Sequence, residues 1–208
     1  MRNLIVRSLS SLILLPIIFY LITNSLTLKV FTIICFFISC YEWSKMNKNY
    51  FYKISGYIFL SISFLSFFIL AQNILLVFFI LTICISTDIG GYVVGKLLNG
   101  PKLTKISPNK TYSGMLGGYF FSIISLYFFS NFFVLKNIPF YKLIMIVIII
   151  STVSQIGDLI ISFFKRKSKI KNTGNLIPGH GGLLDRIDGM IFVFPTFYLI
   201  YFIGIFQL

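Results

Sequence analysis

Acidic side chains are scarce in this sequence, which has five Asp and Glu residues against 18 Lys and Arg residues in 208 positions. Charged residues of either sign make up only 11% of the chain, and hydrophobic residues make up 57%. The mean hydropathy is +0.93. This composition excludes an ordinary soluble domain and favours a polytopic membrane protein.

Cysteine and histidine are also rare. Cys35, Cys40 and Cys84 lie in apolar segments and lack C-x-x-C spacing, so neither a disulfide framework nor a cysteine-based zinc site is supported. His180 is the single histidine. Arg2 and Arg7 precede an apolar run as in a signal peptide, but no small-x-small cleavage site follows, so we expect a retained first helix.

Apolar runs bounded by polar or Gly/Pro clusters predict an all-α, polytopic integral membrane helical bundle of about seven transmembrane spans. The expected spans are Ser8–Thr23, Leu28–Tyr41, Ile54–Ala71, Ile74–Gly95, Gly114–Leu135, Ile138–Phe164 and Ile187–Phe206. A helix needs ~20 apolar residues to cross a bilayer. The second run is short for that, so the first two runs could form a tilted or re-entrant hairpin.

The positive charges predict the orientation. With a cytoplasmic N-terminus, fifteen Lys and Arg residues fall in cytoplasmic segments, and only Lys29, Lys136 and Lys142 fall on the other side. That split follows the positive-inside rule. Both long polar loops, Lys96–Ser113 and Lys165–Arg186, are then cytoplasmic, and the C-terminus is external.

Four of the five acids occupy costly positions. Asp88 and Asp158 lie inside apolar runs, and Asp185 and Asp188 open the last run. A carboxylate at membrane depth indicates a functional site when it faces a wet cavity or a partner. Asp88 and Asp158 each precede a basic helix end by seven or eight residues, so we expect them at similar depth, ~10–12 Å below it, in one polar cavity. The alternative is that these acids only pair with buried Lys or Arg to aid helix packing.

The stretch from Ser162 to Asp188 combines three kinds of group. A basic strip ends at Lys171, a Gly/Pro segment around Pro178 follows, and Asp185 and Asp188 flank Arg186. Cations and glycine amides suit phosphates, and carboxylates suit a metal ion, so the combination indicates nucleotide phosphate chemistry. The basic strip alone could equally be a topology signal.

This stretch resembles the characteristic motif of phosphatidate cytidylyltransferases, also called CDP-diacylglycerol synthases. The matching positions are Ser162, Lys165, Arg166, Lys171, Pro178, His180, Gly181, Gly182, Asp185, Arg186 and Asp188. Gly157-Asp158 stands just ahead, as in the family. An upstream stretch is similar to the family at Asp88, Gly90, Tyr92, Gly95, Lys96, Ser107, Pro108, Lys110, Thr111, Gly114, Gly117 and Gly118.

The chain departs from the family pattern at two positions. Asn172 stands where the family motif has Asp, and Ser113 stands where many members have Glu. Each change removes a negative charge. A metal-binding role at position 172 is therefore not expected to carry over. Glu42-Trp43, at the end of the second run, also looks similar to the family.

The resemblance implies a Mg²⁺-dependent enzyme that converts CTP and phosphatidic acid to CDP-diacylglycerol and pyrophosphate. It implies catalytic roles for Asp158, Asp185, Asp188, Lys165, Arg166 and His180, with the three acids as Mg²⁺ ligands. Substrate contacts are expected from Asp88, Ser107, Lys110, Thr111, Ser162, Lys171, Gly181, Gly182 and Arg186. Gly114, Gly117 and Gly118 are expected chiefly to pack helices closely.

The resemblance also implies a setting and a division of the chain. We expect an integral protein of the bacterial inner membrane with a cytoplasmic active site and without a nucleic-acid partner, and a homodimer is a further expectation. Residues 1–53 would form a membrane hairpin and cytoplasmic loop, and residues 54–208 the catalytic membrane domain. The alternatives are another CTP-dependent membrane lipid kinase or transferase and, less favoured, a small cation transporter.

Overall fold

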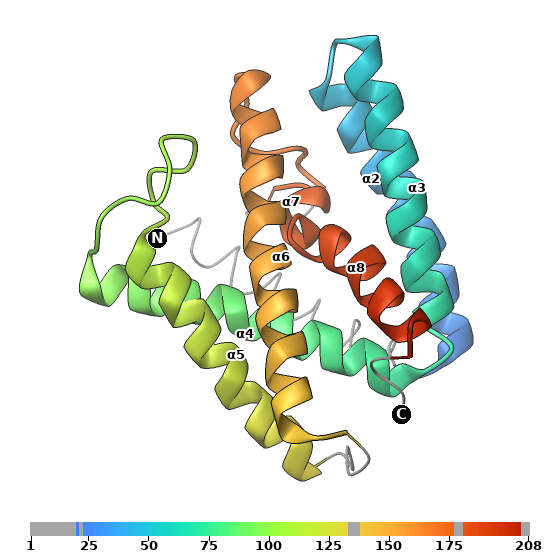
Figure 1. Ribbon diagram of the computed structural model, residues 1–208. Coiled ribbons are helices and arrows are strands. Elements are labelled where there is room, and N and C mark those ends of the chain that lie inside the picture. The colour runs from blue at the N-terminus through green and yellow to red at the C-terminus, as the bar shows by residue number, and fades with distance from the viewer. Residues whose placement is uncertain (1–19, 21–22, 133–137, 177–180, 205–208) are drawn as a thin grey trace.

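The computed structural model describes residues 20, 23–132, 138–176 and 181–204, and every regular element in them is a helix (Figure 1). The helices are α2 (Ser25–Met46), α3 (Tyr50–Leu70), α4 (Ile74–Leu98), α5 (Tyr112–Phe132), α6 (Phe140–Lys167), α7 (Leu184–Ile187) and α8 (Met190–Phe202). The predicted all-α membrane bundle is confirmed. Most of the expected first span, Ser8–Thr23, lies outside the described residues.

Within the described residues, five helices, α2 to α6, are long and apolar enough to cross a membrane. The second of the expected spans is longer than its apolar run, since α2 has 22 residues. It begins after Asn24, whose side chain accepts a hydrogen bond from the Leu26 amide. Asn49 and Asn73 cap α3 and α4 in the same way. By length and composition α2 is therefore a candidate span, because the helix extends beyond the apolar run at both ends.

The last apolar run forms a shorter helix than expected. The run predicted as Ile187–Phe206 contains α8, which has 13 residues and includes Pro195. At 1.5 Å per residue it is about 20 Å long, less than the ~30 Å hydrocarbon core. Asp185 and Asp188 precede this helix, around the single turn of α7.

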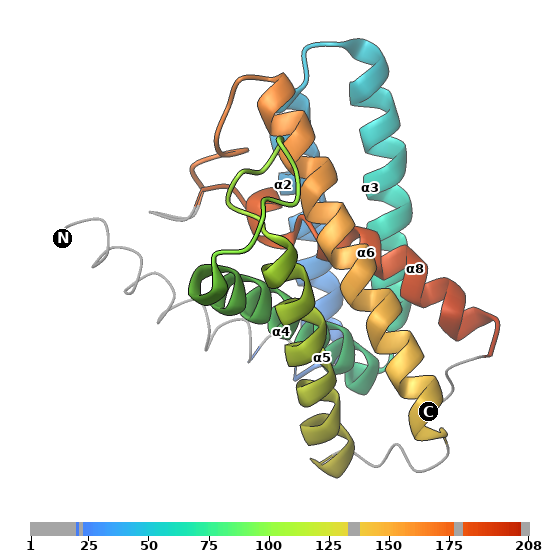
Figure 2. The same cartoon turned by 60° about the vertical axis from the view of Figure 1, so that its left-hand side comes forward.

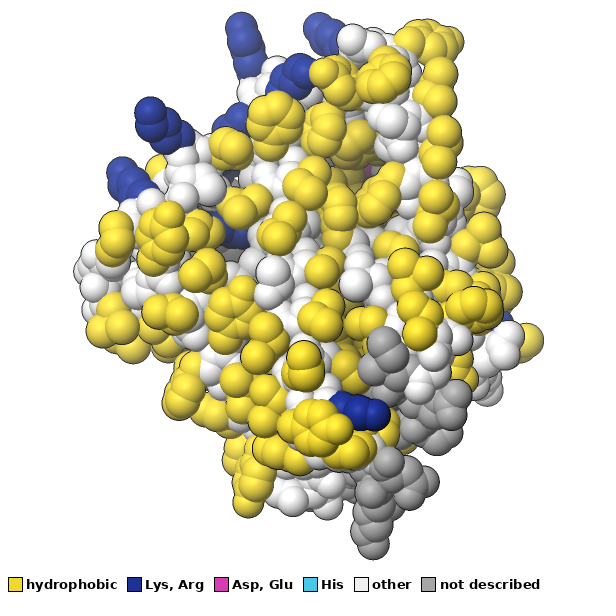
Figure 3. Space-filling view, in the orientation of Figure 1, with side chains coloured by type: hydrophobic (Ala, Val, Ile, Leu, Met, Phe, Trp, Pro, Cys, Tyr) yellow, Lys and Arg dark blue, Asp and Glu magenta, His cyan; other side chains and the backbone are white. Residues whose placement is uncertain are grey.

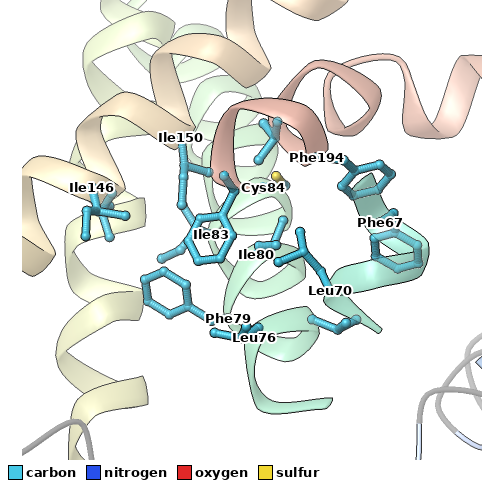
Figure 4. Packing of buried hydrophobic residues seen from close by; sticks show 14 of the residues in the cluster. Phe67, Leu70, Leu76, Phe79, Ile80, Ile83, Cys84, Ile146, Ile150 and Phe194 are labelled. Carbon is cyan, nitrogen blue, oxygen red and sulfur yellow. The ribbon is translucent and has the colours of Figure 1, made fainter. Parts of the chain in front are cut away.

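The core is built around α4. In both views α4 crosses α6 at a steep angle (Figures 1 and 2). Phe79, Ile80 and Ile83 of α4 are fully buried. They belong to one cluster with residues of α3, α6 and α8, including Phe67, Ile150 and Phe194 (Figure 4). The expectation that Asp88 of α4 and Asp158 of α6 lie at similar depth assumed that both helices run in the same direction through the membrane. Because α4 crosses α6, counting residues along α4 does not give a depth that can be compared with one along α6.

Glycines bring α4 and α5 into close contact, as the sequence predicts. A Cβ atom on Gly114 would lie 2.7 Å from the Gly91 carbonyl oxygen, and one on Gly117 would lie 2.7 Å from that of Gly90. A Cβ on Gly118 would meet Gln155 and Thr87. Gly114, Gly117 and Gly118 therefore serve as helix-packing residues.

The basic loops share one side of the bundle. The α2–α3 turn, the α4–α5 loop and the end of α6 lie in the upper part of Figure 1, while the α3–α4 turn lies in the lower part. Dark-blue side chains gather in the same upper region of Figure 3, above a surface that is mainly yellow. This asymmetry agrees with the predicted grouping of positive charge, although the side that faces the cytoplasm remains a prediction.

Candidate active site

Two distant parts of the chain meet in an ion pair between Lys110 and Asp158. Lys110 lies in the loop between α4 and α5, and Asp158 lies on α6. Both side chains are about a quarter to a third exposed, at 27% and 30%. The upstream and downstream motif stretches therefore form one site.

The α4–α5 loop has a defined backbone shape that presents Lys110. The Leu103 amide donates to the Lys110 carbonyl at 2.7 Å, and the Lys110 amide donates to the Ser107 carbonyl at 3.1 Å. Pro108 follows Ser107, the favoured place for proline in such a turn. The Thr111 hydroxyl accepts from the Gly114 amide at 3.0 Å and so caps α5.

One face of α6 carries Asp158, Ser162 and Lys165, which are spaced by four and three residues. The Ser162 hydroxyl donates to Asp158 Oδ1 at 3.3 Å. Lys165 Nζ lies 2.9 Å from Asp185 Oδ1 and 3.7 Å from Asp188 Oδ2. Lys165 therefore joins α6 to both acids that precede α8.

Asp185 has both carboxylate oxygens engaged. Its Oδ1 pairs with Lys165, and its Oδ2 accepts from the amides of Thr173 at 2.8 Å and Gly182 at 3.1 Å. Its side chain is only 5% exposed. Gly181 has a φ of 95°, and a Cβ there would lie 2.8 Å from Asp185 Oδ2. Asp185 thus holds the end of the loop in place.

Asp188 and Asp158 lie within electrostatic reach of each other. Asp188 lies between α7 and α8, outside the five long helices. Burial, and then the charge of Asp158, raise the pKa of Asp188 well above its ordinary range. Two carboxyl groups this close are stabilised when a proton or a cation reduces their repulsion. Asp88 is within electrostatic reach of Asp158, Lys110 and Arg186.

The described residues contain no group of three or more His, Cys, Asp or Glu side chains arranged to hold a metal ion. The Asp158–Asp188 pair still offers two adjacent carboxylates. Mg²⁺ is commonly held by one or two carboxylates together with substrate phosphates and waters. The carboxylate oxygens of this pair therefore fit Mg²⁺. Like those of Asp185, they already have protein partners: Asp158 contacts Ser162 and Lys110, and Asp188 contacts the Gly189 amide and Lys165.

Several of the predicted site residues lie at the edge of this cluster or beyond it. Arg166 and Lys171 are exposed, and Arg186 is exposed within electrostatic reach of Asp88. His180 lies outside the described residues. Gly182 adjoins Asp185 through its amide.

Glu42 joins the site although the sequence analysis gave it no role there. It is 3% exposed at the end of α2, and its Oε2 accepts from the Thr173 hydroxyl at 2.8 Å. The sequence contains one signal that could have pointed to this residue: Glu42, in the pair Glu42-Trp43, is the single acid at the end of an apolar run.

Comparison with known proteins identifies a family for this chain. The model described as "Cytidylyltransferase family" matches residues 67–204. A phosphatidate cytidylyltransferase of Bacillus subtilis (strain 168) is 41% identical over 125 residues, which are 60% of this chain and 46% of that protein. One from Staphylococcus saprophyticus is 46% identical over 110 residues, which are 52% of this chain and 42% of that protein. These matches span less than half the length of either relative. The family model covers more than half of the chain, including Lys110, Asp158, Asp185 and Asp188, and the chain belongs to the cytidylyltransferase family.

Proposed function

We propose that this chain transfers the cytidylyl group of CTP to phosphatidic acid, giving CDP-diacylglycerol and pyrophosphate. The observation that carries the proposal is the Lys110–Asp158 ion pair, which unites the two motif stretches at one cluster of charges. The names of the relatives, phosphatidate cytidylyltransferases, agree with this substrate pair.

In this reaction a phosphate oxygen of phosphatidic acid forms a bond to the α-phosphorus of CTP. The bond from that phosphorus to the bridging oxygen breaks, and pyrophosphate leaves with the electron pair. Both substrates are anions, so their approach requires fixed positive charge. Lys110 and Lys165 supply two such charges, because each already points into the carboxylate cluster. A phosphate monoester is ionised near neutral pH and needs little help from a general base.

Mg²⁺ is part of the proposal, with Asp158 and Asp188 as its protein ligands and Asp185 as the third predicted ligand. When bound, Mg²⁺ would neutralise phosphate charge and polarise the phosphoryl group. Asp158 is the most exposed of the three side chains, at 30%. Ser162 steadies it through a hydrogen bond.

The proposed setting is the bacterial inner membrane with the charged cluster facing the cytoplasm, where CTP is found. It is supported by the basic side chains that gather on one side of the bundle (Figure 3). A homodimer is a further expectation, and the mass of the purified protein in detergent would test it.

The deciding experiment measures the products formed from CTP by the purified protein in detergent, with and without phosphatidic acid, Mg²⁺ and a chelator. We expect pyrophosphate and CDP-diacylglycerol only when both phosphatidic acid and Mg²⁺ are present. A CTP-dependent lipid kinase would release CDP instead. Formation of CDP, or no turnover of CTP, would overturn the proposal.

A matched pair of lysine variants tests the ion pair itself. Lys110→Met should lower turnover by about a hundredfold, in line with the loss of one charge-stabilising group. Lys102→Met, in the same loop but exposed, should stay within about threefold of the wild type. Equal activity of the two variants would show that the loop does not act through Lys110.

A further inference from the structure

The Glu42 carboxylate is buried among donors from the loop that follows α6. Its Oε1 accepts from the Leu183 amide at 2.9 Å. Its Oε2 accepts from the Leu184 amide at 2.9 Å and from the Thr173 hydroxyl at 2.8 Å. Hydrogen bonds to an ionised acceptor are about twice as strong as neutral ones. Glu42 therefore ties α2 to two points of the loop that lie ten residues apart.

The backbone of this loop fits closely around the carboxylate. A Cβ atom on Gly174 would lie 2.7 Å from Glu42 Oε1, and one on Gly182 would overlap with Oε2 and with Thr173. Glycine at both positions lets the backbone approach the carboxylate. Any side chain there would push the loop away from α2.

Thr173 links Glu42 to the charged cluster. Its hydroxyl donates to Glu42, and its amide donates to Asp185 Oδ2 at 2.8 Å. Asp185 in turn accepts from Lys165, which also faces Asp188. A continuous set of hydrogen bonds thus leads from α2 to the acids that precede α8.

We propose that Glu42 is a positioning residue for the cytidylyl-transfer site. It acts through Thr173 and the Leu183–Leu184 amides to hold the loop so that Asp185 and Lys165 meet. The inference rests on the proposed function for its effect on turnover, while its effect on the loop stands apart from that function. Glu42 lies outside residues 67–204, so a helix beyond the family-model match completes the site.

Limited trypsin digestion tests the loop without reference to activity. Lys169 and Lys171 are exposed in the loop, and Lys105 is exposed in the α4–α5 loop as an internal reference. Glu42→Gln should speed cleavage at Lys169 and Lys171 by roughly tenfold relative to Lys105, because an amide places a donor against backbone donors. Ser39→Ala, on the same buried face of α2, should cleave like the wild type. Ser39 has no hydrogen-bond partner for its hydroxyl among the described residues.

A second pair of variants guards against a Glu42→Gln protein that fails to fold. Thr173→Val removes the hydroxyl at nearly constant size and should also speed cleavage of the loop, whereas Thr173→Ser keeps the hydroxyl and should not. Turnover should fall in Glu42→Gln and Thr173→Val and recover in Thr173→Ser. Unchanged cleavage in both Glu42→Gln and Thr173→Val would overturn the positioning role. The variants could be cleaved faster while the unmutated protein makes no CDP-diacylglycerol. That result would uphold the loop contacts and reject only the proposed function.

Discussion

The acids of the site differ in how their oxygens are engaged. Asp185 has one oxygen on Lys165 and the other on two amides, so it organises the loop. Asp158 and Asp188 lie within electrostatic reach of each other, and Asp158 is the more exposed. A cation entering the cluster would therefore meet the Asp158–Asp188 pair first.

At the residue scale, Asp188→Asn and Asp185→Asn should each abolish turnover for different reasons. Asp188→Asn removes charge from the predicted metal site, which is worth several kcal/mol in the transition state. Asp185→Asn removes the negative charge that pairs with Lys165 and accepts from the loop amides. It should therefore also expose the loop to trypsin. Assays of pyrophosphate release and thermal melting in detergent distinguish the two. Either variant keeping more than about a tenth of wild-type turnover would contradict its assigned role.

Asn172→Asp should change turnover by less than about tenfold. Asn172 lies beside Gly181, where a Cβ would be 3.2 Å from the Asn172 Cγ and 2.8 Å from Asp185 Oδ2. A new carboxylate there would stand next to an acid that is already satisfied, so it adds charge repulsion and no needed ligand. The native protein could instead be inactive and become fully active through this single change. That result would show that the predicted ligand set is incomplete.

At the scale of helices, the close contact of α4 and α5 sets the position of the loop that carries Lys110. The glycines at this contact are spaced so that both backbones approach. The sequence predicted this packing from Gly114, Gly117 and Gly118. It did not predict that α4 runs across α6, because helix crossing depends on which side chains meet, and a one-dimensional pattern does not contain that information.

Two alanine substitutions separate crowded from open glycine sites on these helices. Gly117→Ala places a methyl group against Val94 and 2.7 Å from the Gly90 carbonyl, which should destabilise the protein by about 1–3 kcal/mol. Gly91→Ala meets only the Gly114 carbonyl, at 3.6 Å, an ordinary contact, and should have little effect. Thermal unfolding in detergent compares them. Equal melting temperatures would mean that α4 and α5 are further apart than described.

At the scale of the whole molecule, the sequence predicted the class of fold, five of the long helices and the meeting of distant acids. The acids could be found because a carboxylate in an apolar run is conspicuous. The partners of Asp185 could not be predicted. The positions of the Thr173 and Gly182 amides depend on the fold of the loop and have no sequence signature. The reduced length of α8 was missed because apolar residues on both sides of it extend the run.

Reporter fusions should place Lys102 and Lys169 in the cytoplasm and Gln72, in the α3–α4 turn, on the opposite side. The reason is the concentration of basic residues on one side of the bundle. A fusion at Leu208 tests whether the last apolar run crosses the membrane together with the residues that flank the short helix α8, in which case it reports an external position. A cytoplasmic signal there would mean that the number of spans differs from seven, and an external signal at Lys169 would place the charged cluster on the wrong face for CTP.

The contact between Glu42 and Leu184 has a consequence for biosynthesis, since the two residues are 142 positions apart. At ~5–20 residues per second, roughly 7 to 28 s separate their emergence from the ribosome. During most of this interval α2 is complete but the Glu42 carboxylate has none of its loop donors, because the first of them, Thr173, is made only shortly before Leu183 and Leu184. Water must solvate the carboxylate in their place. The end of α2 therefore lacks these contacts until Leu184 has been made. The contacts of Glu42 with the Leu183 and Leu184 amides therefore form later than Lys110 and Asp158 become available to each other.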